Sequence, residues 1–186
     1  MKTEQVWEQG GYMLRSARWE DAEDYYAQNF CPMEPEIARL TGSRTDFSRD
    51  EVVDFVRRCV QAEDRYDFFL IAPDGRMIGE SVINEIDWAL RCGNFRIVIF
   101  HERDCGKGLG GFMTAAVRDF AFGTLGLHRL ELDVFSFNPR AEQTYLRAGF
   151  RREGVLREAV RDGDGYGDDI LMAMLETDWQ AFKQKT

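Results

Sequence analysis

The sequence contains no long hydrophobic run, and this absence sets a first limit on what the protein is. No apolar segment approaches the ~18 residues that a membrane-spanning helix requires. The opening residues, Met1 to Trp7, also lack the apolar stretch of a secretory signal peptide, so we expect a cytoplasmic protein. A hydrophobic fraction of 44%, with 14 Phe and 4 Trp, argues against disorder and predicts a folded chain.

Cysteine and histidine are scarce, at four and two residues. No C-x-x-C pair occurs, so the cysteines are expected to be reduced thiols without a disulfide framework. His101 lacks the partner histidine of a zinc motif, and His128 stands alone. Residues 162–168 begin like a calcium loop, but Tyr166 and Ala173 occupy positions where ligands belong. We interpret this segment as a hairpin turn and expect no metal.

Basic side chains are outnumbered, with 24 Lys and Arg against 33 Asp and Glu and a net charge of -9. This balance disfavours nucleic-acid binding and favours cationic small molecules or peptides. The chain also lacks internal repeats, low-complexity tracts and long linkers, and its 186 residues suffice for one ordinary core. We expect a single domain over residues 1–186, with its core at about 11–176 and a polar tail at 177–186.

Local periodicity predicts a mixed α/β chain in the order strand, two helices, three strands, helix, strand, helix and two strands. The expected strands are 11–15, 66–72, 77–86, 95–100, 130–134, 150–160 and 166–175, and the expected helices are 19–29, 48–60, 109–121 and 138–149. Because residues 95–100 are nearly all apolar, we place this strand in the middle of the sheet with both faces covered.

A glycine-rich turn, Cys105 to Gly111, follows this buried strand and precedes a helix. Glycines allow phosphate oxygens to approach backbone N–H groups, and the positive end of the helix dipole favours negative charge. The order of strand, glycine turn and helix therefore predicts an anion site.

The turn alone leaves three interpretations open. Gly106, Gly108 and Gly111 satisfy G-x-G-x-x-G, and Glu131 lies 20 residues further on, as in dinucleotide-binding folds. Those folds continue with further βα units, whereas only 75 residues remain after Gly111. A phosphate-loop NTPase is disfavoured because no Gly-Lys-Ser/Thr triplet is present. A turn that only tightens a strand-to-helix connection is the structural alternative.

Two later segments give the turn a context. Asn138-Pro139-Arg140-Ala141 opens the last expected helix, and Tyr145-Leu146-Arg147-Ala148-Gly149-Phe150 closes it. Together with the turn, they make residues 69–175 resemble the GNAT superfamily of N-acetyltransferases. The ending, residues 154–175, is similar to the branch that holds spermidine and ribosomal-protein N-terminal acetyltransferases.

The pyrophosphate loop of that superfamily has the pattern Arg/Gln-x-x-Gly-x-Gly/Ala. Gly108 and Gly110 match its glycines, whereas Cys105 departs from its first position. Because such a loop binds mainly through backbone amides, we expect the departure to alter loop packing more than cofactor choice.

The resemblance implies a GNAT acyl-CoA N-acyltransferase fold, with a central, mostly antiparallel twisted sheet flanked by helices. It implies acetyl-CoA as cosubstrate and direct attack, in a ternary complex, by a primary amine of a polyamine, a protein N-terminus or a small molecule. The cofactor-binding residues that it implies are Val98, Ile99, Phe100, Cys105, Gly106, Lys107, Gly108, Leu109, Gly110, Gly111 and Asn138.

The reaction needs a base and an acid. An alkyl amine with a pKa near ~10.4 is only about one part in 10³ neutral at pH 7. The resemblance to spermidine acetyltransferases indicates Glu85 as the base, with Glu80 or a water chain as alternatives. The departing thiolate gains from a proton donor, and Tyr145, seven residues after Asn138, matches the tyrosine that fills this role in the family.

Other interpretations of these residues also stand. Tyr145 also fits a core aromatic, and either glutamate a solvated strand carboxylate. A non-catalytic acetyl-CoA sensor on the same fold is the alternative function, and exposed edge strands make a homodimer an expected state.

Overall fold

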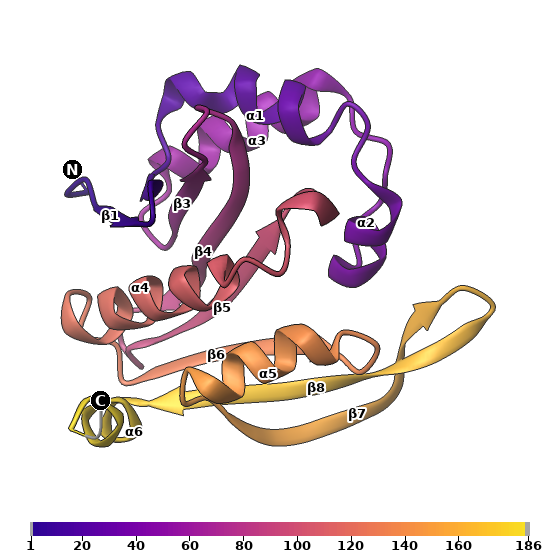
Figure 1. The fold of residues 1–186 in the computed structure, drawn as a ribbon. Coiled ribbons are helices and arrows are strands. Elements are labelled where there is room, and N and C mark those ends of the chain that lie inside the picture. Colours follow the sequence, from indigo (N-terminus) through magenta and orange to yellow (C-terminus); the bar gives the residue numbers. More distant parts are fainter. Residues whose placement is uncertain (1, 185–186) are drawn as a thin grey trace.

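The apolar segments form an eight-stranded sheet in the computed structural model, which describes residues 2–184 (Figure 1). The strands are β1 (Val6–Gln9), β2 (Tyr12–Ser16), β3 (Tyr66–Ile71), β4 (Met77–Asp87), β5 (Cys92–Ile99), β6 (Arg129–Phe135), β7 (Arg151–Asp162) and β8 (Gly165–Leu175). Their order across the sheet is β1-β2-β3-β4-β5-β6-β8-β7, and every neighbouring pair is antiparallel except β5 and β6. The mixed, mostly antiparallel sheet confirms the predicted fold class.

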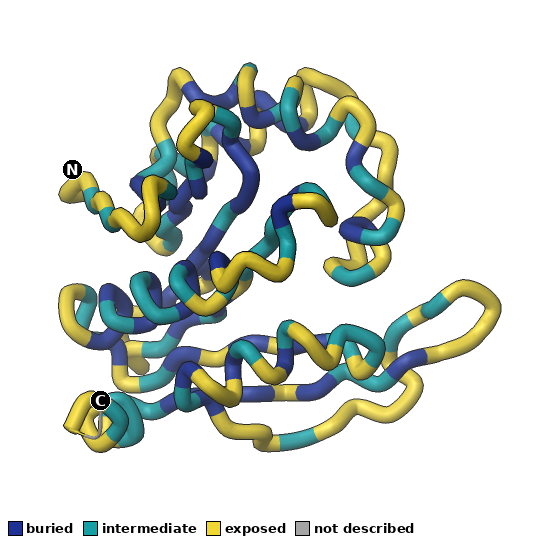
Figure 2. Tube along the Cα trace, viewed as in Figure 1, coloured by how far each residue is buried: buried dark blue, intermediate teal, exposed yellow. Residues whose placement is uncertain are grey.

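Helices cover both faces of the sheet. They are α1 (Ala22–Asn29), α2 (Pro35–Thr41), α3 (Arg49–Gln61), α4 (Leu109–Gly123), α5 (Pro139–Arg147) and α6 (Glu176–Lys183), with short 3-10 turns η1 (Trp19–Asp21) and η2 (Glu102–Asp104). The α4 and α5 helices share a core with Phe68, whereas α1 and α3 pack with its neighbour Phe69, which points to the opposite face. Buried residues follow the central strands and the second half of β8, and the edge strand β7 is largely exposed (Figure 2).

The start of α3 is decided locally. The Ser48 hydroxyl accepts a hydrogen bond from the Glu51 N–H at 3.3 Å, and the Glu51 carboxylate accepts one from the Ser48 N–H at 2.8 Å. This reciprocal cap satisfies two N–H groups that the first helical turn leaves unpaired. It explains why the sequence predicts this helix correctly from its N-terminus.

Two elements near the N-terminus were not predicted. The strand expected from Gly11 has a partner, β1, which pairs with β2 from Val6 opposite Arg15 to Gln9 opposite Tyr12. The α2 helix is the second, and its short apolar stretch gives little periodicity.

The predicted polar tail from Thr177 is wrong over most of its length, because these residues form α6. The Trp179 ring stacks on Phe122 of α4 at 5.7 Å between centroids, and its indole N–H donates to Asp119 at 2.7 Å. Trp179 and Phe182 thus pack this otherwise mostly polar helix against the core. Residues 185–186 of the expected tail lie outside the described residues.

The sheet opens between β5 and β6, where only three residue pairs form, from Cys92 opposite Arg129 to Asn94 opposite Glu131. Beyond them β5 continues along β4 and β6 continues along β8, and the two strands diverge (Figure 1). We call this V-shaped opening the β5–β6 gap. Along it, residues 95–99 have no strand partner among the described residues on the β6 side.

Candidate active site

The glycine turn lies at the open end of the β5–β6 gap. Gly106 and Gly108 have φ of +76° and +78°, in the left-handed region that favours glycine. A Cβ atom added at Gly106, Gly108 or Gly111 would meet nothing within 4 Å, so the backbone of the turn is open to a ligand. At Gly110 the added atom would lie 3.7 Å from the Ile97 side chain of β5, which shows that the turn borders the gap.

The N-terminus of α4 is left uncapped by any side chain. Gly108 is its N-cap residue and forms no side-chain cap. Leu109 is buried in the core and anchors the first turn of the helix. The N–H groups of that turn have no intrahelical acceptor, and together with the helix dipole they favour an anion. The half-buried Cys105 and the exposed Lys107 flank this backbone site.

Backbone direction separates the predicted strand residues. The Phe100 N–H donates to the Ile78 carbonyl of β4 at 2.9 Å, so Phe100 points its backbone groups away from the gap. Because successive residues of a strand direct these groups to opposite edges, Val98 does the same, whereas Ile97 and Ile99 direct theirs into the gap. Of the three strand residues in the predicted cofactor-binding set, only Ile99 therefore presents its backbone there, together with Ile97. Strand periodicity gives the alternation, but only the pairing with β4 fixes its phase.

Tyr145 of α5 packs where the gap begins. Its side chain is 5% exposed, and its ring lies 6.3 Å from that of Phe95, the first β5 residue beyond the last β5–β6 pair. Burial, and then the nearby Asp133 carboxylate, raise the pKa of the Tyr145 phenol above its usual value. The hydroxyl thus keeps its proton at neutral pH and forms no hydrogen bond to another described residue.

Asn138 serves as the N-cap of α5. Its side-chain oxygen accepts a hydrogen bond from the Ala141 N–H at 3.2 Å. This contact fixes the start of the helix that carries Tyr145.

The two glutamates of β4 lie in different surroundings. Glu85 is exposed and sits in a β-bulge with φ of +54°, level with the part of β5 that still pairs with β6. Glu80 is half-buried opposite Val98, along the open part of β5, and accepts a hydrogen bond from the Tyr25 hydroxyl at 2.9 Å. Burial, and then the negative charge of Asp67, raise the pKa of Glu80 to about 7.

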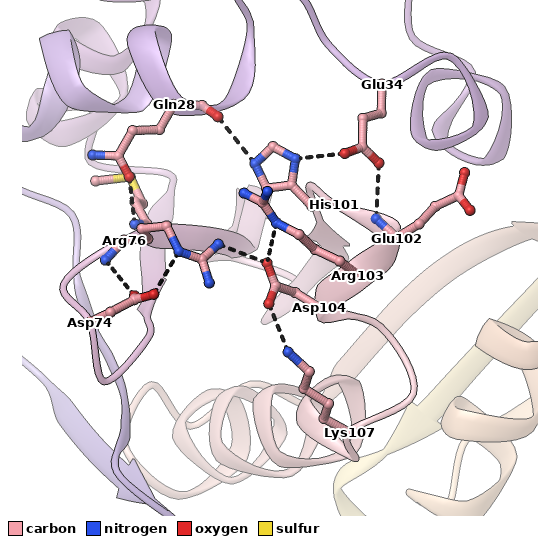
Figure 3. Close-up of polar contacts among 10 residues, drawn as sticks. Gln28, Glu34, Asp74, Arg76, His101, Glu102, Arg103, Asp104 and Lys107 are labelled. Carbon is pink, nitrogen blue, oxygen red and sulfur yellow. Dashed lines mark hydrogen bonds and ion pairs between the residues drawn. The ribbon is translucent and has the colours of Figure 1, made fainter.

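A second polar cluster ties α1 to the end of β5 (Figure 3). Nδ1 of His101 lies 2.9 Å from the Glu34 carboxylate, and Nε2 lies 3.1 Å from the backbone carbonyl oxygen of Gln28. Both partners are hydrogen-bond acceptors. Glu34 also accepts from the Glu102 N–H at 2.9 Å, and this bond, with the one to His101, lowers the pKa of Glu34 despite its partial burial.

Asp104 directly precedes the glycine turn and binds the side chains of two cationic residues. It is 1% exposed, and it accepts hydrogen bonds from Lys107 at 2.8 Å and from Arg76 of the β3–β4 turn at 3.0 Å (Figure 3). Burial raises the pKa of Asp104, but the two cations outweigh burial and lower it to about 2. Sequence reasoning missed this contact because Arg76 lies 28 residues away along the chain.

Within residues 2–184, no group of three or more His, Cys, Asp and Glu side chains is placed to hold a metal ion. In the same part of the chain, every helix is too short or too polar to cross a bilayer.

Comparison with known proteins identifies the family. A model described as an acetyltransferase (GNAT) domain matches residues 12–151. The chain is 31% identical over 134 residues to the probable N-acetyltransferase YjcK of Bacillus subtilis, a match that covers 70% of this chain and 72% of that protein. It is 28% identical over 130 residues to the spermidine N(1)-acetyltransferase of Vibrio cholerae, covering 70% and 75%. The chain therefore belongs to the GNAT family of acetyltransferases.

The fold agrees with this assignment. The crystal structure of a spermidine N-acetyltransferase from Vibrio cholerae, in complex with CoA and spermine, superposes with a TM-score of 0.81 over 92% of this chain and 99% of that one, at 24% identity. The predictions of a GNAT fold, of an N-acetyltransferase and of acetyl-CoA as cosubstrate are confirmed, and the dinucleotide interpretation of the turn is set aside.

Proposed function

We propose that this protein acetylates a primary amine of a cationic small molecule, and we regard a polyamine as the first substrate to test. The observation that carries the proposal is the β5–β6 gap, with the open glycine turn at its end and buried Tyr145 where it begins. Similarity to spermidine acetyltransferases and the net charge of -9 support a cationic acceptor.

The residues at the gap fit acetyl-CoA, which supplies the thioester that the amine attacks. The N–H groups from Gly108 to Gly111 would hold phosphate oxygens, because no side chain caps this end of α4 and a Cβ at Gly108 or Gly111 would meet no atom within 4 Å. The backbone groups of Ile97 and Ile99 align the cosubstrate along β5. A backbone N–H at this edge also stabilises the negative charge that develops on the carbonyl oxygen.

Tyr145 acts as the general acid in this proposal. Its raised pKa keeps the phenol protonated, and its free hydroxyl is available to donate to the departing sulfur. The thiol of CoA has a pKa comparable to the ~8.5 of cysteine. Sulfur that receives a proton as it departs is therefore a better leaving group than the unprotonated thiolate.

Glu80 replaces Glu85 as the proposed base. Its pKa of about 7 suits a group that accepts a proton at neutral pH, and its strand position faces Val98 along the open part of β5. A chain of water links it to the amine in this proposal. Glu85 is exposed and lies beside the part of β5 that still pairs with β6, so we assign it no role in proton transfer.

A thiol-release assay tests the function. Spermidine, a peptide with a free N-terminus and an aminoglycoside are offered with acetyl-CoA to the wild type and to Tyr145→Phe. We expect turnover of spermidine, and a kcat about 10²-fold to 10⁴-fold lower in the variant with CoA affinity unchanged. Tyr166→Phe, at an exposed position of β8, is the matched control.

Two results would contradict the proposal. Equal kcat in Tyr145→Phe and in the control removes Tyr145 as the acid. Binding of acetyl-CoA without turnover of any amine favours the sensor alternative.

We also propose that the chain self-associates through the β7–β8 hairpin. A structure of the Vibrio cholerae spermidine acetyltransferase is dodecameric. In this chain the hairpin exposes large apolar side chains at Val155, Leu156 and Tyr166. Light scattering after size exclusion should give a mass above that of one chain, and Leu156→Glu should lower it.

A further inference from the structure

The loop pattern of the family is broken at Cys105, but the guanidinium group of Arg76 lies close to that position. The pattern places Arg or Gln at this position, and the chain carries Cys105. Arg76 reaches the preceding residue, Asp104, from the β3–β4 turn, with Nη1 3.0 Å from the Asp104 carboxylate. A guanidinium group therefore lies next to the glycine turn, supplied by a different part of the chain (Figure 3).

Asp104 fixes two cations at once. One carboxylate oxygen accepts from Arg76 and the other from Lys107 at 2.8 Å. The carboxylate side chain is 2% exposed, whereas the side chains of Arg76 and Lys107 are 37% and 42% exposed. The anion is thus inside the protein and the two cations are at its surface beside the turn.

The Arg76 guanidinium forms hydrogen bonds to described residues on one side only. Its Nε donates to Asp74 at 2.8 Å, and Nη1 donates to Asp104. Nη2 donates to no described residue. Counting Arg103, 3.7 Å from Asp104, the cluster holds three cations and two carboxylates, a net charge of +1 (3 − 2).

We propose that Arg76 binds a phosphate group of acetyl-CoA, and that Asp104 is the positioning residue that holds Arg76 and Lys107 at the rim of the glycine turn. A guanidinium forms strong, directional bonds to phosphate oxygens. Holding it in place before the ligand arrives reduces the entropy lost on binding. Arg76 thereby supplies the charge that Cys105 cannot.

Substitution of Asp104 separates positioning from simple charge. A buried carboxylate close to an anion site repels the anion, so if Asp104 acted only through its charge, Asp104→Asn would tighten CoA binding. If Asp104 positions the cations, the same substitution releases them and weakens CoA binding. The two explanations predict opposite signs.

The test measures the Kd of CoA by calorimetry and the KM of acetyl-CoA for Arg76→Gln and Asp104→Asn. Arg91→Gln, which removes an exposed arginine paired with Glu176, is the matched control. We expect Arg76→Gln to raise both constants about 10-fold, which is typical for loss of a charge-assisted contact, with kcat at saturation unchanged. Asp104→Asn should raise them as well, and Arg91→Gln should leave them unchanged.

Truncated cosubstrates identify the phosphate. The effect of Arg76→Gln on KM is compared for acetyl-CoA, acetyl-3′-dephospho-CoA and S-acetylpantetheine, which lacks all phosphates. A loss with the first alone assigns Arg76 to the 3′-phosphate, and an equal loss with the first two assigns it to the pyrophosphate. Either result supports the proposal.

Three results would overturn it: an equal loss with S-acetylpantetheine, constants for Arg76→Gln equal to those of Arg91→Gln, or tighter CoA binding by Asp104→Asn. The S-acetylpantetheine measurement also detects a general distortion of the turn, because such damage does not depend on phosphate.

Discussion

Glu80 and Glu85 show how differently the same residue type behaves five positions apart on one strand. The sequence predicts that both lie on the same strand, and both are candidates for the catalytic base. A β-bulge after Asn84 turns Glu85 outward, while Glu80 stays under α1 with Asp67 nearby. Burial and neighbouring charge shift the pKa of Glu80, and neither is written in the local sequence.

The pH profile of the amine reaction distinguishes the two carboxylates. Because the pKa of Glu80 is raised to about 7, its carboxylate form accumulates as pH rises, and kcat should rise through this range. Glu80→Gln should lower kcat about 10²-fold and remove that rise. Glu85→Gln is the control, and loss of the rise in Glu85→Gln instead would show that the base is Glu85.

Tyr25 should influence the pH dependence of kcat through its hydrogen bond to Glu80. Its hydroxyl donates to the Glu80 carboxylate and so stabilises the charged form. Tyr25→Phe keeps the ring that stacks on Phe69 but removes the hydrogen bond, so the pKa of Glu80 should rise and the rising limb of kcat should move to higher pH. A limb that stays in place would mean that Glu80 does not control it.

At the scale of elements, prediction succeeded where the signal is local. The cap at Ser48 is a property of neighbouring residues, and the apolar residues of β5 correctly predict its place inside the sheet. The prediction that both faces of β5 are covered is wrong, because Arg96 is exposed and residues 97–99 are only half-buried. The α6 helix was missed because two aromatic side chains, Trp179 and Phe182, pack it against the core, whereas most of its other residues are polar. Its stability comes from contact with α4, which is distant in sequence.

Trp179→Ala measures that contact. Loss of ring stacking and of the hydrogen bond to Asp119 should lower the free energy of unfolding by about 2 kcal/mol, less than a fully buried tryptophan would lose. Denaturant titration gives the value. Gln180→Ala, exposed on the same helix, should change it by less than about 0.5 kcal/mol, and equal effects would show that α6 does not dock through Trp179.

At the scale of the whole molecule, α2 joins the two sides of the opened sheet. Arg39 of α2 donates from Nε and Nη2 to Asp162 at the end of β7, at 2.5 and 2.9 Å, across 123 residues of chain. On the other side, Ile37 packs in a cluster that contacts Val98 of β5. The gap was not predictable from sequence, because it depends on where two distant strands stop pairing.

Removing that connection should loosen α2 without unfolding the protein. The Arg39–Asp162 pair is solvent-exposed, and such pairs contribute little to stability. We expect Asp162→Asn to leave Tm nearly unchanged and to speed amide exchange in α2, measured by mass spectrometry. Unchanged exchange in α2 would indicate that apolar contacts alone hold it.

CoA should act on the whole fold through the β5–β6 gap. A ligand that binds only the folded state raises Tm with its concentration. Amide exchange at Ile97 and Ile99 should slow when CoA binds, while residues 92–94, already paired with β6, should change little. Equal slowing along all of β5 would contradict the assigned backbone directions.

An opened sheet also has a consequence for the lifetime of the protein in the cell. Without CoA, two strand edges inside the molecule carry unpaired backbone groups, and such edges admit local opening and attack by proteases. Bound CoA would cover these edges and so protect the chain from cleavage. Limited proteolysis with and without CoA gives the direct measurement, and protection by CoA is the expected result.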